Sequence, residues 1–145
     1  MLKSYVAFDV ETTGLDPEEN EIIEIGALKV REGKVQERFM ELLKPREAIS
    51  QTITNLTGIT NQMVKNARTA DQVVPDFLDF CREDVLIGHN ILFDYSFMKV
   101  KAAGIGMSFE KYGIDTLKIA RKVHQELDSK SLERLCEYYQ IENKS

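Results

Sequence analysis

Apolar and β-branched residues gather in three runs in the first third of the chain, separated by short polar segments. The first run, Ser4 to Val10 (SYVAFDV), is apolar at most positions, which is typical of a strand buried on both faces. The second and third runs predict strands from Glu21 to Val30 and from Val35 to Leu43, joined by a turn at Glu32-Gly33-Lys34. Three strands with short connections predict an antiparallel meander.

After Pro45 the spacing of apolar residues changes to the helical period of three to four residues. This spacing predicts a short helix near Thr52 to Leu56, a second helix after Thr60, and a longer helix around Ala70 to Cys81. Pro75 lies inside the third helix, where proline removes a backbone hydrogen bond. That helix is therefore expected either to kink or to start later.

A short apolar strand followed at once by a helix is the next predicted unit. Val85 to Gly88 predicts the strand, and the helix is expected from Ile91 to about Ala103, with Asn90 as its N-cap and Gly104 as its terminating glycine. Strands early in the chain with helices interleaved later predict an α/β fold with a mixed sheet flanked by helices. Two further helices are predicted from Asp115 to about Val123 and from Ser131 to about Tyr139.

Length and composition bound the class of protein. A chain of 145 residues with 43% hydrophobic content suffices for one core and is short for two, so residues 1–145 are expected to form a single domain. Neither a membrane span nor a secretory signal is visible, which predicts a cytoplasmic protein without a membrane partner. The cysteines Cys81 and Cys136 lack metal-ligand spacing and are expected to be reduced.

The charge balance limits how the chain could bind nucleic acid. A net charge of −5 argues against a broad basic surface that gains affinity through counterion release. An acidic protein can still act on a polyanion where bound cations supply positive charge locally, and its affinity then depends on those ions.

Asp9 and Glu11 are the first candidate functional pair. Because side chains alternate along a strand, the two carboxylates project from one face, about 6.6 Å apart along the chain. They would repel each other and lose solvation, so a positive charge is expected between them, and oxygen ligands favour Mg²⁺ or Mn²⁺ over zinc. The alternative is that the strand ends at Val10, which leaves Glu11 in solvent and Asp9 as a turn cap.

Asp94 is the second candidate, in the first turn of the helix predicted after the short strand. The helical period places it near one stripe with Phe97, Met98 and Lys101, so its carboxylate lies beside large apolar residues that face the sheet. The alternative is an acid favoured by the helix dipole, without a chemical role. Glu24 lies on the strand predicted next to Asp9, and the direction of its side chain stays open.

Four segments of the sequence are more specific together than any of them alone: FDVETTGLDP (Phe8 to Pro17), IIEIGA (Ile22 to Ala27), GHNILFDYSFM (Gly88 to Met98) and DTLKIAR (Asp115 to Arg121). In this order they resemble the DnaQ-like branch of the DEDD 3′–5′ exonuclease family, whose fold is ribonuclease H-like. The segment ITNLTGIT (Ile53 to Thr60) further resembles the proofreading exonuclease domain of PolC-type bacterial DNA polymerase III. The resemblance covers essentially the whole chain.

The resemblance implies a metal-dependent 3′–5′ exonuclease that hydrolyses single-stranded DNA 3′ ends, in proofreading during DNA replication. It implies that Asp9, Glu11 and Asp94 hold two divalent cations, Mg²⁺ or Mn²⁺. A replicative DNA polymerase is then the partner or part of the same chain. Structural alternatives stay open for some contact residues, namely turn formation for Thr12, core packing for Phe93 and capping for Asn90. The implied substrate-binding residues are Thr12, Leu15, Thr57, Asn90 and Phe93.

The third motif of this family, H-x-A-x-x-D, supplies a histidine general base and a fourth metal-binding aspartate, and it does not occur before Ser145. His89 and His124 are not convincing substitutes. The chain is therefore expected to be an exonuclease domain truncated before that motif, with little or no activity and weak metal affinity, while a longer version is active. The alternatives are a 3′–5′ exoribonuclease of the same superfamily and a non-catalytic polymerase-docking module.

Overall fold

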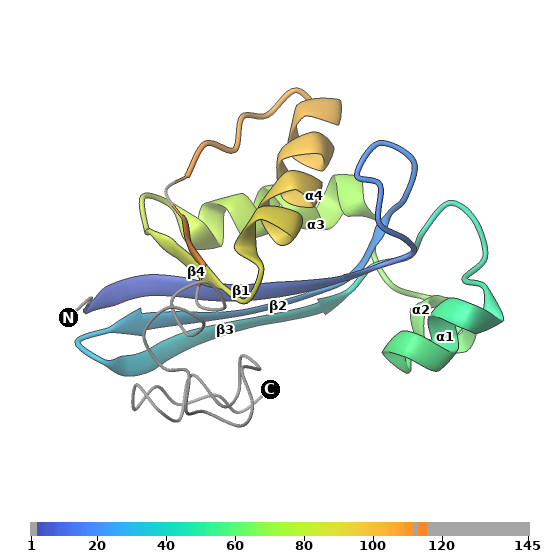
Figure 1. Ribbon diagram of the computed structural model, residues 1–145, viewed down its shortest axis with the longest axis horizontal. Coiled ribbons are helices and arrows are strands. Elements are labelled where there is room, and N and C mark those ends of the chain that lie inside the picture. The colour runs from blue at the N-terminus through green and yellow to red at the C-terminus, as the bar shows by residue number, and fades with distance from the viewer. Residues whose placement is uncertain (1–2, 112, 116–145) are drawn as a thin grey trace.

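A mixed sheet of five strands forms the middle of the fold, in the order β3-β2-β1-β4-β5 (Figure 1). The computed structural model describes residues 3–111 and 113–115 of the chain. β1 (Ser4–Thr12) pairs antiparallel with β2 (Ile22–Arg31), and β2 pairs antiparallel with β3 (Lys34–Leu42). These strands are the predicted meander, with ends that differ from the predicted ones by one or two residues.

The other edge of β1 carries two parallel strands, β4 (Leu86–Gly88) and β5 (Gly113–Asp115). β4 confirms the predicted short strand. β5 is a correction, because Asp115, predicted to open a helix, is the last residue of a strand. Three residues are too few for a periodic pattern to reveal a strand. The predictions for the helices after Asp115, for His124 and for Cys136 lie outside the described residues.

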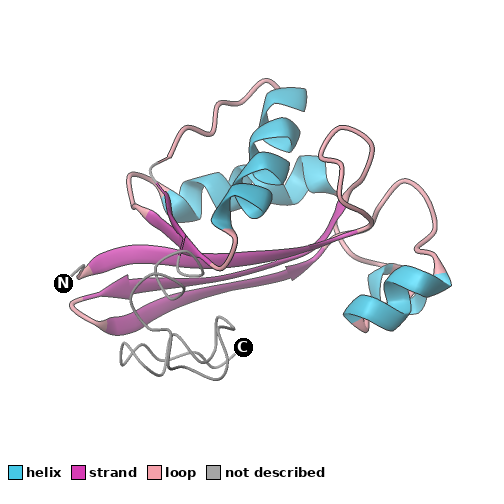
Figure 2. Cartoon of the chain, in the orientation of Figure 1, coloured by secondary structure: helices cyan, strands magenta, loops and turns pink. Residues whose placement is uncertain are grey.

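Two long helices cover one face of the sheet, as Figure 2 shows in the same view as Figure 1. They are α3 (Ala70–Cys81) and α4 (Ile91–Gly104). The short helices α1 (Gln51–Thr57) and α2 (Asn61–Val64) lie beyond the end of β3. In the described part of the chain, no helix is long and apolar enough to cross a membrane. The predicted α/β fold with a mixed sheet flanked by helices is confirmed.

The start of α3 is set before its internal proline. The backbone N–H of Thr69 donates to Oε1 of Gln72 at 3.0 Å as part of a capping box. Capping satisfies backbone donors that the first helical turn leaves open. The helix therefore begins at Ala70, and the alternative of a later start is wrong.

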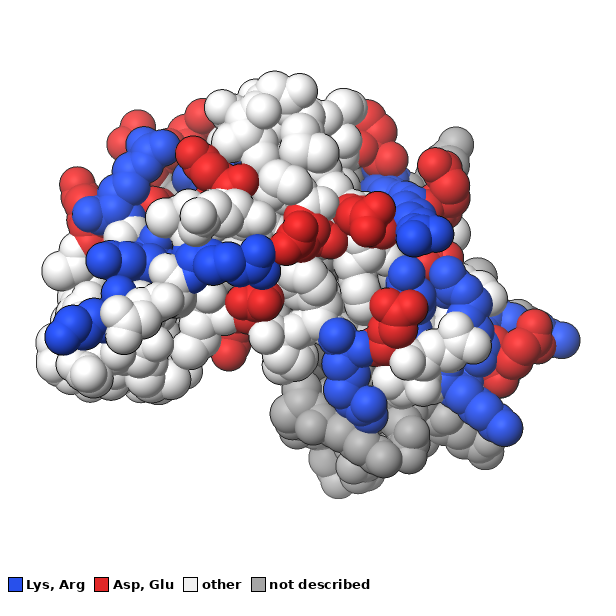
Figure 3. All heavy atoms as spheres, turned by 180° about the vertical axis from the view of Figure 1, so that it is seen from behind, with Lys and Arg blue, Asp and Glu red and all other residues white. Residues whose placement is uncertain are grey.

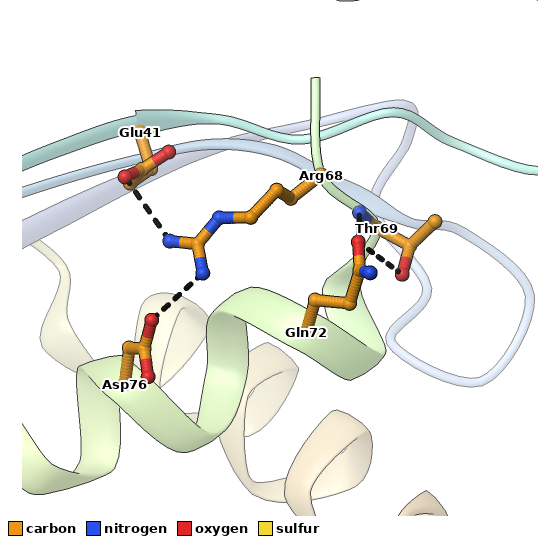
Figure 4. A network of polar contacts seen from close by, with 5 residues as sticks. All are labelled: Glu41, Arg68, Thr69, Gln72 and Asp76. Carbon is orange, nitrogen blue, oxygen red and sulfur yellow. Dashed lines mark hydrogen bonds and ion pairs between the residues drawn. The ribbon is translucent and has the colours of Figure 1, made fainter. Parts of the chain in front are cut away.

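Arg68 connects the start of α3 to the edge of the sheet (Figure 4). Its guanidinium donates to Oδ2 of Asp76 on α3 at 2.8 Å and to Oε1 of Glu41 on β3 at 3.2 Å. The three side chains are largely accessible to solvent, and ion pairs of this kind add little stability. Their effect is to orient the first turns of α3 over β3.

Phe77 lies at the centre of the aromatic core between α3 and the sheet. Its side chain is fully buried, and its ring centroid lies 5.3 Å from that of Phe8 on β1 and 5.5 Å from that of Phe39 on β3. Phe80 and Phe109 lie at centroid distances of 6.4 and 6.2 Å. Aromatic pairs at these distances stabilise beyond the apolar area that they bury. The cluster holds α3 against β1.

The end of α4 differs from the predicted one. Gly104 belongs to the helix, and Gly106 adopts the left-handed conformation with φ of 79°. The backbone N–H of Gly106 donates to the carbonyl oxygen of Ala103 at 3.1 Å. Ile105, between the two glycines, packs against the main core. An apolar contact after the last turn commonly accompanies a glycine-terminated helix. Here the contact of Ile105 favours termination at Gly106, so Gly104 stays within the helix.

Gly88 allows the end of β4 to approach β1 closely. A Cβ at this position would lie 2.6 Å from Cδ1 of Ile91 and 3.0 Å from the backbone oxygen of Phe8. We predict that Gly88→Ala lowers the free energy of unfolding by about 1–3 kcal/mol, because the strand backbone cannot move aside freely.

Gly104→Ala is the matched control for this prediction. An added Cβ at Gly104 meets no packing neighbour within 4 Å, and the residue is helical. Alanine in a helix is expected to leave the stability unchanged or to raise it by up to about 1 kcal/mol. Urea unfolding measures both variants, and equal stabilities for the two would contradict the prediction.

Candidate active site

Asp9 and Glu11 project from the face of β1 opposite the one that α3 and α4 cover. β1 continues to Thr12, so the alternative in which the strand ends at Val10 is wrong. Phe8 and Val10 belong to the core under the helices. Because side chains alternate along a strand, Asp9 and Glu11 both lie on the other face, as the sequence predicts.

Glu24 brings a third carboxylate to this face. In the antiparallel register, Glu24 of β2 is the Cα partner of Glu11, and Gly26 is the partner of Asp9. Directly opposite residues on one face have Cβ atoms roughly 5 Å apart. The sequence alone did not give the direction of the Glu24 side chain, because the pairing of β1 with β2 sets the register between the two strands. Once that register is known, alternation along β2 gives its direction.

Asp94 reaches the same strand from the first turn of α4. Its side chain is 3% exposed, and its Oδ1 accepts a hydrogen bond from the backbone N–H of Val10 at 3.4 Å. β4 pairs with β1 at Val6 and Ala7. The backbone N–H of Val10 lies beyond these pairs, and the Asp94 carboxylate accepts its hydrogen bond. The predicted stripe on α4 is confirmed for Phe97 and Met98, both fully buried.

Burial raises the pKa of the three carboxylates on this face, and repulsion between them raises the pKa of Glu11 and Glu24 further. Burial raises the pKa of Asp9 although part of its side chain reaches solvent, and a hydrogen bond with the Val10 backbone opposes this shift. Burial raises the pKa of Glu11 first, and the charges of Asp9 and Glu24 raise it further. Burial, then the charge of Asp9, raises the pKa of Glu24. The ion pairs among the described residues include none of the three.

These acids are expected to destabilise the fold as the pH rises. A carboxyl whose pKa is higher in the folded state keeps its proton longer when folded, so its contribution to stability is present below the unfolded pKa and is lost as the pH passes the folded pKa. We predict that Glu11→Gln weakens this loss. The variant should raise the free energy of unfolding at neutral pH by less than about 1 kcal/mol, because the side chain stays partly solvated.

Urea unfolding from about pH 4 to about pH 8, in chelator and at low salt, measures this effect. Glu37→Gln removes the same charge from an exposed position of β3 and serves as the control. Identical pH profiles for the unsubstituted protein and Glu11→Gln would contradict the prediction.

The donor chemistry of this face suits a hard divalent cation. Carboxylate oxygens are the ligands that Mg²⁺ and Mn²⁺ prefer, and a cation beside Asp9 and Glu11 would offset their repulsion. Among residues 3–111 and 113–115, no three histidine, cysteine, aspartate or glutamate side chains lie close enough together to hold a metal ion. A cation shared by Asp9 and Asp94 would compete with the hydrogen bond from Val10.

Two of the predicted substrate-binding residues, Thr12 and Thr57, use their hydroxyls in local turns. The Thr12 hydroxyl donates to the carbonyl oxygen of Gly14 at 2.6 Å. The Thr57 hydroxyl donates to the carbonyl oxygen of Ile53 at 2.8 Å and accepts from the backbone N–H of Ile59 at 3.1 Å. Turn formation, the structural alternative for Thr12, therefore accounts for the contacts of its side chain.

Leu15 and Phe93 present apolar surface from two different elements. Leu15 is 84% exposed in the loop after β1. That loop is closed by a hydrogen bond from the backbone N–H of Thr13 to the carbonyl oxygen of Glu21 at 2.8 Å. Phe93, on α4, is half-buried, and its ring centroid lies 5.0 Å from that of Phe97. Leu15 is therefore fully available for contact and Phe93 in part.

Asn90 precedes α4 as predicted, but its side chain does not cap the helix. Its backbone is left-handed, with φ of 60° and ψ of 49°, whereas N-cap residues are usually extended. Asparagine tolerates this conformation better than most residues. The backbone N–H of Phe93 donates to the carbonyl oxygen of Asn90 at 3.0 Å. The capping role is therefore wrong for the side chain, which is exposed.

A cavity of about 740 Å³ lies away from the acids. Its walls are the loop after β1, the segment from Lys44 to Ala48, the start of α1, the start of α3 and Lys101, and they include none of Asp9, Glu11 and Asp94. On the face shown in Figure 3, acidic and basic side chains are interspersed over the described residues. The candidate site therefore rests on the geometry of the carboxylates around β1.

Comparison with solved structures identifies the fold. Exonuclease X in complex with 5′-overhanging duplex DNA matches with a TM-score of 0.69 and 23% identity, over 97% of this chain and 76% of that chain. Product-bound exonuclease I matches with a TM-score of 0.77 and 17% identity, over 100% of this chain and 40% of that chain. The strand order and these likenesses define a ribonuclease H-like α/β domain.

Residues 6–145 match the family described as Exonuclease (RNase_T), and the chain belongs to this family. PolC-type DNA polymerase III of Caldanaerobacter subterraneus subsp. tengcongensis is 42% identical over 137 residues, 94% of this chain and 10% of that protein. The corresponding polymerase of Thermotoga maritima is 39% identical over 135 residues, 92% of this chain and 10% of that protein. The chain thus spans about a tenth of their length, and the predicted resemblance is confirmed.

Proposed function

We propose that the chain is a metal-dependent 3′–5′ exonuclease domain that hydrolyses phosphodiester bonds at single-stranded DNA 3′ ends, in proofreading during DNA replication. The observation that carries the proposal is the approach of Asp94 on α4 to the strand of Asp9 and Glu11, at the backbone N–H of Val10. Acids from two distant segments of the chain thereby lie near the C-terminal end of β1. Membership of the exonuclease family and the similarity to PolC-type polymerases support the proposal.

Asp9, Glu11 and Asp94 are the proposed ligands of two divalent cations, Mg²⁺ or Mn²⁺. Such cations, when bound, polarise the phosphate group and activate a water molecule as the nucleophile. Asp9 and Glu11 would hold them from one face of β1, and Asp94 from the neighbouring edge. One solved relative is described as the zinc ion-bound form of an exonuclease I complex with single-stranded DNA, which supports a divalent-cation site in this fold.

The proposed contacts to the terminal nucleotides come from three elements. Leu15 can insert between bases because its side chain is almost fully exposed, and Phe93 can stack on a base with the open side of its ring. The exposed Asn90 amide can donate and accept hydrogen bonds at the start of α4. Thr12 and Thr57 shape the loop after β1 and the end of α1, so their backbones are the proposed contact groups.

A replicative DNA polymerase is the proposed partner, either in the same chain or in a complex. The support is that the PolC-type relatives contain the matching segment within proteins about ten times as long. Under this proposal the chain acts as a single exonuclease domain that receives the 3′ end from the polymerase.

The test follows digestion of a 5′-labelled single-stranded DNA oligonucleotide by a version of the protein that carries an H-x-A-x-x-D segment after Ser145. We expect a ladder that shortens from the 3′ end in Mn²⁺ and no ladder in chelator. An RNA oligonucleotide of the same sequence tests whether the protein prefers deoxyribose or ribose, because only RNA carries a 2′-hydroxyl. Faster cleavage of RNA would make the protein an exoribonuclease. Cleavage of neither substrate would favour a non-catalytic polymerase-docking module.

A further inference from the structure

Glu24 is an acid that the sequence motifs leave without a role and that the sheet places against the proposed cation ligands. It is the Cα partner of Glu11 across the β1–β2 pair, and both side chains project from the same face. Like charges directly opposite each other on a sheet destabilise it. A half-buried glutamate at this position therefore costs stability when the fold is considered by itself.

The neighbours of Glu24 on the described strands offer no compensating charge. Its Cα partner on β3 is Leu42, an apolar residue, and none of the ion pairs of the described residues includes Glu24. The next position of β2 on this face is Gly26, and a Cβ there would lie 3.3 Å from Cε of Met40. Met40 and Leu42 thus border the acids on the β3 side. A compensating cation would therefore lie on the β1 side, beside Asp9 and Glu11.

We propose that Glu24 is a positioning residue for the cation held by Asp9 and Glu11: its carboxylate adds a third negative charge and accepts hydrogen bonds from water bound to that cation. The inference rests on the proposed function, because it takes Asp9 and Glu11 as the ligands. Mg²⁺ keeps several waters when it binds to proteins, so carboxylates around the direct ligands act through those waters. Such partners orient ligands and strengthen metal binding.

A role toward the cation and a merely structural role predict opposite effects on stability. If Glu24 served the fold, replacing it would lower the unfolding midpoint without metal. If it serves the cation, Glu24→Gln relieves repulsion from Glu11, so the midpoint without metal stays equal or rises while metal affinity falls. Glutamine keeps the size of the side chain and removes only the charge.

The experiment measures Mn²⁺ binding by electron paramagnetic resonance of free Mn²⁺, with unfolding midpoints in chelator, on the version of the protein that carries an H-x-A-x-x-D segment after Ser145. We expect Glu24→Gln to weaken Mn²⁺ binding about 10-fold. Glu24→Asp, which keeps the charge, should lose less. Glu37→Gln, the same charge change at an exposed position of β3, should bind Mn²⁺ as the unsubstituted chain does.

Glu11→Gln separates this inference from the proposed function. Loss of Mn²⁺ binding in Glu11→Gln with unchanged binding in Glu24→Gln would overturn the role of Glu24 and leave the proposed site standing. Unchanged binding in both variants would overturn the site and the inference together. A lower unfolding midpoint of Glu24→Gln in chelator, or its failure to fold, would assign Glu24 a structural role and overturn the inference.

Discussion

Asp9→Asn is expected to lower the rate of 3′-end hydrolysis by at least about 1,000-fold, equivalent to about 4 kcal/mol of transition-state stabilisation. Asparagine keeps the shape of the side chain and removes one charge from the proposed cation ligands. Asp9 has a backbone hydrogen bond with Val10, whose N–H also donates to Asp94. Glu11 lies two residues further along the same face. Asp9 and Asp94 thus meet at the same backbone N–H, so a charge lost at Asp9 is expected to affect any cation that these acids share.

The same substitution is expected to leave the fold intact. Burial raises the pKa of Asp9, so a neutral amide at this position relieves a cost of folding at neutral pH. Single-turnover rates in saturating Mn²⁺, measured on the version with the H-x-A-x-x-D segment, test the effect on hydrolysis. Unfolding midpoints of the same samples test the fold.

Asp79→Asn is the matched control for Asp9→Asn. Asp79 is exposed on α3, on the helix-covered side of the sheet, and it takes part in none of the ion pairs of the described residues. Its substitution should change neither rate nor stability. A rate for Asp9→Asn within about tenfold of the unsubstituted protein would contradict the assignment of Asp9 as a cation ligand.

Phe77→Ala is expected to lower the free energy of unfolding by about 3–5 kcal/mol. The ring is fully buried, and four aromatic rings from different parts of the chain lie around it. Alanine would remove the apolar contacts of the whole ring and leave a cavity that the surrounding strands cannot fill by relaxing. Because domains of this size are only marginally stable, the loss takes up much of the total stability.

Urea unfolding followed by circular dichroism measures this loss. Phe77→Leu, which leaves a smaller cavity, should lose less than Phe77→Ala and gives a second measurement if the alanine variant does not fold. Leu56→Ala is the surface control, because Leu56 is 77% exposed on α1. A loss for Phe77→Ala no larger than that for Leu56→Ala would show that the aromatic cluster does not hold α3 to the sheet.

The elements of the fold could be predicted where the signal is local. The three strands of the meander follow from runs of β-branched and apolar residues, and α3 has the predicted bounds, Ala70–Cys81. In each case the spacing of apolar positions extends over many residues, so several residues indicate the same buried face. The proline within α3 does not displace its start, because the capping box at Thr69 and Gln72 precedes it.

The sequence alone did not predict the correct structure where two conformations suit the same residues or where the element is short. Gly104 and Gly106 are both suitable terminators of α4, and the core contact of Ile105 selects the second. Asn90 is a good N-cap by residue type, yet the tight passage from β4 to α4 gives it a left-handed backbone instead. β5 has three residues and exists through its pairing with β4, which no sequence window contains.

The sequence by itself determined that Asp9 and Glu11 share one face and that Asp94 lies on the buried stripe of α4, because alternation and helical period are properties of neighbouring residues. Only the tertiary structure decided that Asp94 reaches the N–H of Val10 and that Glu24 faces Glu11. Both contacts depend on the register between strands and on the packing of α4 beside β1. Sheet hydrogen bonds and core packing set that register, and both join residues that are far apart in the chain.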